Sequence, residues 1–135
     1  NIKDGYALQL AVKSGLTVAV ITGSSSVPVK ERLLKLGVEL FFENIPLKSL
    51  TIKELLLKLN IEKSSALFMG DDLPDLDAFG AVGIKTCPAD AATELLQVAD
   101  YISPQPGGNG CVRDIIEKVL RTQGKWSAPK NIQSI

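Results

Sequence analysis

The segment 70–75, with the sequence GDDLPD, carries three carboxylates directly after an apolar run. Asp71, Asp72 and Asp75 repel one another unless a cation or protons compensate their charge. Hard carboxylate oxygens suit Mg²⁺, which keeps several waters and shares the phosphate oxygens of a substrate. An acid cluster that only complements a helix dipole is the alternative, and it explains Asp72 well. We favour a metal site, with Asp71 and Asp75 on one face at the start of a helix.

Two other polar features follow apolar runs. Thr22 and Gly23 come after the run 17–21, and their hydroxyl and N–H groups can donate to a phosphate oxygen. Lys48 comes shortly after the run 38–42 and supplies a point positive charge. Each feature alone is ordinary, because Thr-Gly is common in turns and a Lys before a helix is usually solvated. The ordered set Thr, Lys, Asp-Asp-x-x-Asp is far more specific, and it indicates phosphate chemistry.

Short apolar runs alternate along the chain with amphipathic stretches. The predicted strands are 17–22, 38–42, 65–69, 82–87 and 101–103, and the predicted helices are 4–14, 28–36, 48–59, 90–98 and 111–122, with a short helix at Pro74. This alternation predicts an α/β fold, a parallel sheet with helices on both faces. Ligands bind beyond the carboxyl ends of such strands, so the three polar features should meet at one rim.

The composition argues against several classes of function. The 135 residues are 45% apolar and 22% charged, as in one ordinary globular domain. The formal net charge is zero, which gives no broad attraction to nucleic acid or to an anionic membrane. There is no His, and Cys87 and Cys111 lie far apart, so a zinc site is not indicated. No apolar run is long enough to span a bilayer, and we expect a cytoplasmic protein.

The glycine-rich segment 107–110 opens the last predicted helix. Its N–H groups could cradle a phosphate, but it lacks the spacing of the dinucleotide and Walker motifs. A flexible loop is the default interpretation, and a lid or a contact between subunits is the alternative. Arg113 follows closely and could pair with an anion, although a surface Arg is the more common case.

These motifs resemble those of the haloacid dehalogenase superfamily. Ile21-Thr22-Gly23 resembles the second motif of the superfamily. Lys48 resembles the third motif, and the segment 70–75 resembles the fourth. Further segments resemble the 3-deoxy-D-manno-octulosonate 8-phosphate phosphatase family, which includes phosphatases of related nine-carbon keto-sugar acids: 3–6 (KDGY), 88–91 (PADA), 107–114 (GGNGCVRD) and 123–126 (QGKW). The similarity runs through residues 2–126. We therefore expect one phosphatase domain over 1–126 and a C-terminal tail over 127–135.

The resemblance implies a Rossmann-like parallel sheet with a minimal cap. It also implies a homotetramer in which neighbouring subunits help to close the active site. In the family, one Asp attacks phosphorus to form an aspartyl-phosphate, and a second Asp, two residues later, protonates the leaving sugar oxygen. The substrate it implies is the phosphomonoester of an acidic keto-sugar, and the implied cofactor is Mg²⁺.

The motif match also implies roles for individual residues. Asp71 would be a magnesium ligand, and Asp75 would orient water or Lys48. Thr22 and Lys48 would hold the phosphate. Gly23, Ser24 and Arg113 would contact the substrate, and Asp72 would lie close behind the metal site.

The chain departs from the family pattern at two places. The opening motif of the family, Asp-x-Asp-Gly-Val, is absent from the sequence, and we expect its two aspartates in a segment upstream of Asn1. The family also often has an Arg directly after Thr-Gly, where it can bind the carboxylate of the sugar. Here Ser24 stands at that place, which indicates either a helix-capping serine loop or an altered substrate preference.

Three other functions agree less well with the sequence. Related domains fused to nucleotide-sugar synthetases serve assembly rather than hydrolysis, but a dead site need not keep the set of Thr22, Lys48, Asp71 and Asp75. A signalling receiver domain places its acids first, then Thr and then Lys, whereas here Thr22 precedes Lys48 and the acids come last. A dinucleotide-binding domain lacks support, because no suitable glycine fingerprint follows any predicted strand.

Overall fold

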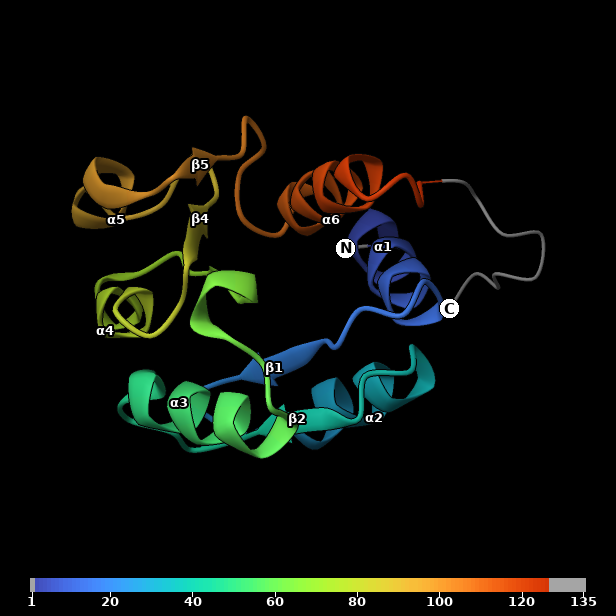
Figure 1. The fold of residues 1–135 in the computed structure, drawn as a ribbon, viewed down its shortest axis with the longest axis horizontal. Coiled ribbons are helices and arrows are strands. Elements are labelled where there is room, and N and C mark those ends of the chain that lie inside the picture. The colour runs from blue at the N-terminus through green and yellow to red at the C-terminus, as the bar shows by residue number, and fades with distance from the viewer. Residues whose placement is uncertain (1, 127–135) are drawn as a thin grey trace. The chain divides into compact units, whose positions relative to one another are not determined.

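The structure is a computed structural model that describes residues 2–126. The predicted tail, 127–135, lies outside the described residues. The chain divides into two compact units, of which one comprises residues 2–44 and 108–126 and the other residues 45–107 (Figure 1). Each unit has its own parallel sheet.

The first unit contains three helices and two strands: α1 (Ile2–Lys13), β1 (Ala19–Ile21), α2 (Val27–Lys35), β2 (Leu40–Phe42) and α6 (Cys111–Thr122). Strands β1 and β2 pair in parallel, with Ala19 opposite Leu40. Helices α1 and α6 pack side by side (Figure 1). The fully buried residues Leu10, Val38 and Leu120 come from three different parts of this unit, which gives it a core of its own.

A side-chain contact joins α1 to the start of α6. Gly110 is the N-cap residue of α6, with φ of 96°, and it has no side chain to cap the helix. Asp4 of α1 takes that place, since its Oδ1 accepts the N–H of Arg113 at 3.1 Å. A carboxylate at a helix N-terminus is favourable for the free N–H groups and for the helix dipole.

The second unit contains α3 (Lys48–Leu59), a 3-10 turn η1 (Lys63–Ser65), β3 (Leu67–Met69), a 3-10 turn η2 (Leu73–Asp75), α4 (Leu76–Phe79), β4 (Ile84–Cys87), α5 (Thr93–Val98) and β5 (Tyr101–Ile102). Its sheet has the order β3-β4-β5, and all neighbours run parallel. The core of this unit consists of Phe79, Cys87, Ala91 and Leu95, against which the partly buried Phe68 packs.

The types of element follow the prediction, while several boundaries differ. The strands are shorter than expected, and η1 was not predicted. Helix α5 begins at Thr93 rather than at residue 90, because the preceding turn is bound to the glycine-rich segment. There the N–H of Ala89 donates to the carbonyl of Gln105 at 3.0 Å, and Asp90 Oδ1 accepts the N–H of Gly107 at 2.7 Å.

Parallel pairing is present within each unit, as predicted. The expectation of one domain over 1–126 stays a prediction. In the part of the chain that the structure describes, no helix has the length and apolar character needed to cross a membrane.

Candidate active site

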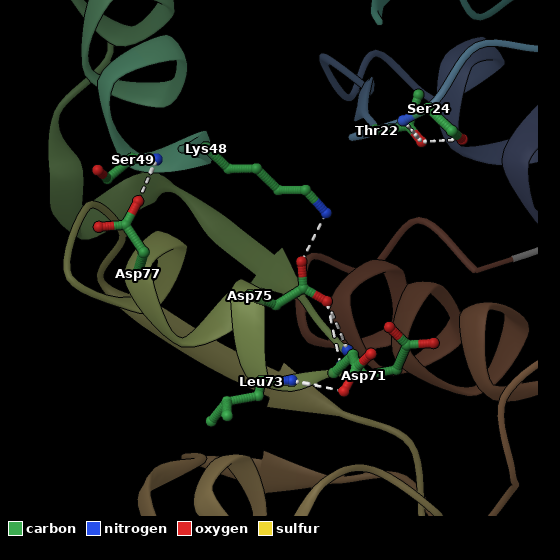
Figure 2. A network of polar contacts seen from close by, with 9 residues as sticks. Thr22, Ser24, Lys48, Ser49, Asp71, Leu73, Asp75 and Asp77 are labelled. Carbon is green, nitrogen blue, oxygen red and sulfur yellow. Dashed lines mark hydrogen bonds and ion pairs between the residues drawn. The ribbon is translucent and has the colours of Figure 1, made fainter. Parts of the chain in front are cut away.

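The carboxylate of Asp75 organises the acidic segment. Its Oδ1 lies 2.5 Å from Lys48 Nζ, and both side chains are largely buried, with 7% and 18% of their surfaces exposed. Its Oδ2 accepts the backbone N–H groups of Asp71 at 3.0 Å and of Asp72 at 3.2 Å (Figure 2). One side chain thus fixes both the lysine and the backbone of the acidic turn.

Burial alone would raise the pKa of Asp75, because it removes water from the charged form. The hydrogen bond from Lys48 and those from the two N–H groups outweigh burial, and the pKa is lowered overall. The carboxylate is therefore ionised at neutral pH. Since Asp75 is paired in this way, its charge is compensated without a metal ion.

The local sequence explains why Asp75 can turn back toward the end of β3. A Cβ atom at Gly70 would lie 2.6 Å from Cβ of Asp75 and 2.9 Å from a ring carbon of Phe68, so only glycine fits at this position. Asp72 is the N-cap residue of η2, and its Oδ1 accepts the N–H of Leu73 at 2.7 Å. The structure thus gives Asp72 a capping role at the start of this turn.

The expected helical spacing of Asp71 and Asp75 is wrong. The turn η2 begins at Leu73, so Asp71 precedes it and does not share a helical face with Asp75. The two residues meet instead through the hydrogen bond from the Asp71 N–H to the Asp75 carboxylate.

Asp71 has a fixed backbone and an exposed side chain. Its N–H donates to Asp75, and its carbonyl accepts the N–H of Ala92 at 2.9 Å. The pKa of Asp71 is raised, first by partial burial, then by a hydrogen bond between its side chain and that of Asp75, and then by the negative charge of Asp75. A carboxylate under this repulsion gains from a nearby cation, and its oxygen donors fit Mg²⁺.

Residues 2–126 contain no group of three His, Cys, Asp or Glu side chains arranged to hold a metal ion. The three acids of the segment 70–75 have different partners, because Asp72 caps a turn and Asp75 pairs with Lys48. Asp71 therefore fits as one ligand of a site whose other protein ligands are not in this segment.

Lys48 is the first residue of α3, where a positive charge opposes the helix dipole. Leu47, the N-cap residue, provides no side-chain cap. Asp77 supplies one from α4, because its Oδ2 accepts the N–H of Ser49 at 3.0 Å (Figure 2). The pKa of Asp77 is lowered by its hydrogen bonds with Ser49. Asp75 and Asp77 together stabilise a helix start that places Lys48 at the acidic turn.

Thr22, Gly23 and Ser24 follow β1 in the first unit. Thr22 Oγ1 accepts the N–H of Ser24 at 3.2 Å and lies 3.1 Å from Ser24 Oγ (Figure 2). The carbonyl of Ser24 accepts the N–H of Asn44, which follows β2, at 3.0 Å. Ser24 therefore stabilises the turn that carries the threonine, and Gly23 is exposed within it.

Arg113 lies in the first unit, near the start of α6. Its guanidinium lies 5.9 Å from the ring centre of Tyr6 and 5.6 Å from that of Trp126. Its Nε is 3.9 Å from a carboxylate oxygen of Glu117. The predicted role of Arg113 in binding substrate stays a prediction, and the structure adds that aromatic rings hold the side chain.

The structure thus brings Lys48 together with Asp71, Asp72 and Asp75, and it brings Thr22 together with Ser24. The convergence of Thr22 with Lys48 and Asp71 joins residues of different units and stays a prediction. Sequence reasoning missed Asp77, whose bond to Ser49 has no signature in local spacing. It also missed Phe68. This residue lies in an apolar strand, so its type and position predict only a role in the core.

The second unit holds a buried ion pair beside an exposed carboxylate at the carboxyl end of a parallel strand, an arrangement suited to anionic substrates and a divalent cation. Comparison with known proteins gives the class. Residues 38–115 match the family described as haloacid dehalogenase-like hydrolase. The 3-deoxy-D-manno-octulosonate 8-phosphate phosphatase of Escherichia coli strain K12 is 36% identical over 135 residues, which are 100% of this chain and 71% of that protein.

Solved structures agree with this match. The crystal structure of the phosphatase of the same name from Yersinia pestis has a TM-score of 0.91 at 30% identity, over 100% of this chain and 71% of that one. The Moraxella catarrhalis phosphatase, solved with magnesium ion, phosphate ion and a KDO molecule, has a TM-score of 0.87 at 36% identity, over 91% and 71% of the two chains. The chain belongs to the haloacid dehalogenase-like hydrolases, and its class is that of the phosphoric monoester hydrolases. The predicted α/β fold is confirmed.

Proposed function

We propose that the complete protein is a magnesium-dependent phosphatase that hydrolyses the phosphomonoester of an acidic keto-sugar. The substrate is 3-deoxy-D-manno-octulosonate 8-phosphate or a related nine-carbon sugar acid phosphate, and the reaction proceeds through an aspartyl-phosphate. The observation that carries the proposal is the buried Lys48–Asp75 pair beside the exposed Asp71 carboxylate, in a chain that matches named phosphatases over its whole length.

The residues of the second unit support distinct tasks. Asp71 would hold Mg²⁺, which offsets negative charge on phosphate oxygens when bound. Lys48 places a positive charge on the phosphate. Asp75 keeps that ammonium and the backbone of Asp71 in place, so it is a positioning residue.

The residues of the first unit would contact the rest of the substrate. Thr22 accepts a hydrogen bond from the N–H of Ser24, and its own hydroxyl proton can be donated either to Ser24 Oγ, 3.1 Å away, or to a phosphate oxygen. Gly23 offers an exposed N–H. Arg113 is the candidate partner for the carboxylate of the sugar, because Ser24 stands where the family often has Arg. In the proposed reaction, the nucleophile and the general acid are the two aspartates of the family's opening motif, Asp-x-Asp.

The test is phosphate release from a panel of sugar phosphates by the full-length gene product, with Mg²⁺ and with EDTA. The panel contains 3-deoxy-D-manno-octulosonate 8-phosphate, a nine-carbon keto-sugar acid phosphate, and a neutral hexose phosphate of similar size. We expect metal-dependent turnover with a preference for the acidic sugars. No turnover of any member would overturn the proposal and favour a non-catalytic assembly domain. Equal turnover of the neutral sugar would overturn the substrate class alone.

A further inference from the structure

The ammonium group of Lys48 lies on the face of an aromatic ring. Lys48 Nζ is 5.8 Å from the ring centre of Phe68, within the range in which a cation is attracted by the ring quadrupole. The same nitrogen is 2.5 Å from Asp75 Oδ1. The lysine is therefore held by two groups of different kinds, a carboxylate and an aromatic face.

The ring of Phe68 is itself fixed. Phe68 lies in the middle of β3, and its ring meets that of Phe79 edge to face, with centroids 6.2 Å apart and planes at 79°. Its side chain packs against the core cluster of Phe79, Cys87, Ala91 and Leu95. A ring held by a strand and by this core presents its face to Lys48 in one orientation.

The two contacts have different consequences for a phosphate. A carboxylate neutralises the ammonium to which it is paired, whereas a ring quadrupole attracts a cation without cancelling its net charge. Lysine has a flexible four-carbon stem, so its position costs conformational entropy unless neighbours fix it. The ring therefore restrains the ammonium without adding a second negative charge beside it.

We propose that Phe68 is a positioning residue that fixes the ammonium of Lys48 for phosphate binding. This inference rests on the proposed function, in which Lys48 binds the phosphate.

The test is the dissociation constant of inorganic phosphate for the full-length gene product with Mg²⁺, measured by isothermal titration calorimetry together with the melting temperature. This constant does not depend on turnover. In Phe68→Leu we expect phosphate to bind about two- to fivefold more weakly, as for loss of a partly exposed cation–π contact. Phe68→Tyr keeps the ring face and should retain the original constant. In a Lys48→Met background, Phe68→Leu should add no further weakening, because the partner of the ring is already absent.

Phe79→Leu is the matched comparison, because it removes another phenylalanine ring from the same core while Phe68 itself stays in place. It should lower the melting temperature and weaken phosphate binding less than Phe68→Leu does. A trifluorinated phenylalanine at position 68 keeps the shape of the ring and withdraws its electron density. It should weaken phosphate binding with little change in stability, and it provides the test if Phe68→Leu does not fold.

An unchanged phosphate constant in the fluorinated variant would overturn the role of Phe68, and so would equal weakening in Phe79→Leu. If Lys48→Met itself leaves the constant unchanged, the phosphate role of Lys48 is wrong, and the inference falls with it. The Lys48 variant therefore separates a failure of the proposed function from a failure of the inference.

Discussion

At the scale of the residue, Asp71 differs from its two acidic neighbours because its carboxylate lies beside the negative charge of Asp75, which contributes to raising its pKa. Asp72 caps a turn and Asp75 pairs with Lys48, whereas Asp71 contributes its backbone to the local network and exposes its side chain. Loss of its charge should therefore lower the affinity for a cation more than it lowers the stability of the fold.

We expect Asp71→Asn to abolish magnesium-dependent activity of the complete protein while the melting temperature stays nearly the same. The amide keeps the shape of the side chain but gives up the charge that binds a hard cation. Asp72→Asn is the matched control, because Asn caps helix starts as well as Asp does, and it should keep most of the activity. Retained activity of Asp71→Asn at saturating Mg²⁺ would contradict the assignment.

Gly70→Ala should disrupt the site through its packing. The added Cβ would lie 2.6 Å from Cβ of Asp75, so Asp75 must move away from Lys48 or β3 must shift. We expect a loss of about 1–3 kcal/mol in the free energy of unfolding, typical of overpacking, together with a large loss of activity. Urea unfolding and the phosphatase assay measure the two effects.

Gly80→Ala provides the comparison, since a Cβ there meets its nearest atom at an ordinary 3.5 Å and the backbone is already right-handed helical. It should be close to neutral in both measurements. Equal effects of the two substitutions would show that the crowding at Gly70 is not the cause.

The sequence allowed prediction of the residues whose chemistry is local. Asp71, Asp72 and Asp75 form one short segment, and the association of Asp75 with Lys48 followed from the resemblance. Contacts between elements were not predictable. The hydrogen bond between Asp77 and Ser49 depends on how α4 packs against α3. The contact between Phe68 and Lys48 depends on the direction in which the lysine side chain points.

At the scale of the element, α3 begins with a lysine and an N-cap leucine, which is a poor helix start by itself. The carboxylate of Asp77 compensates by accepting the N–H of Ser49. Helix α3 thus depends on its neighbour α4 for a cap that its own sequence does not supply.

Asp77→Ala should lower the free energy of unfolding by about 1 kcal/mol near neutral pH, as for loss of an N-cap. The pKa of Asp77 is lowered in the folded state, so its charged form stabilises the fold above the ordinary value of 3.8. This contribution is lost as the pH falls through the folded pKa. The difference between wild type and Asp77→Ala in urea should therefore shrink in acid.

Asp77→Asn separates the two parts of this effect. The amide oxygen can still accept the N–H of Ser49, but it does not titrate, so the variant should keep part of the cap and lose its dependence on pH. A difference between wild type and Asp77→Ala that stays constant into acid would contradict the role of the charge.

Elements were more predictable than their ends. The alternation of apolar runs and amphipathic stretches gave the order of helices and strands, because burial of one helix face or of a whole strand leaves a periodic pattern. The predicted start of α5 was wrong because Ala89 and Asp90 form hydrogen bonds with the segment 105–107 and do not enter the helix. These are tertiary contacts, which a local sequence pattern does not encode.

At the scale of the whole molecule, the chain spans 71% of the length of the phosphatases to which it is similar. The two units are each built on parallel strands, and the polar residues assigned to phosphate and metal are divided between them. The prediction that Thr22 and Lys48 meet therefore concerns residues of different units, and neither unit alone can test it.

We predict that the complete protein is a homotetramer, measured as mass by light scattering coupled to size exclusion. The resemblance implies neighbouring subunits that help to close the active site, and the exposed glycine-rich residues 107–109 are candidates for such a contact. Substitution of Asp90 by Ala, which releases the N–H of Gly107, should weaken assembly if the segment lies at the interface. A monomer would remove the role proposed for this segment.

Trp126 is the only tryptophan of the chain, and it lies against the guanidinium groups of Arg113 and Arg121 at 5.6 and 5.7 Å. Intrinsic fluorescence excited at the indole band therefore originates in the first unit. An emission change during denaturation records the detachment of this indole from α6, and it is blind to events confined to the acidic turn. A spectroscopic readout of the acidic turn therefore needs a second reporter, placed in the second unit.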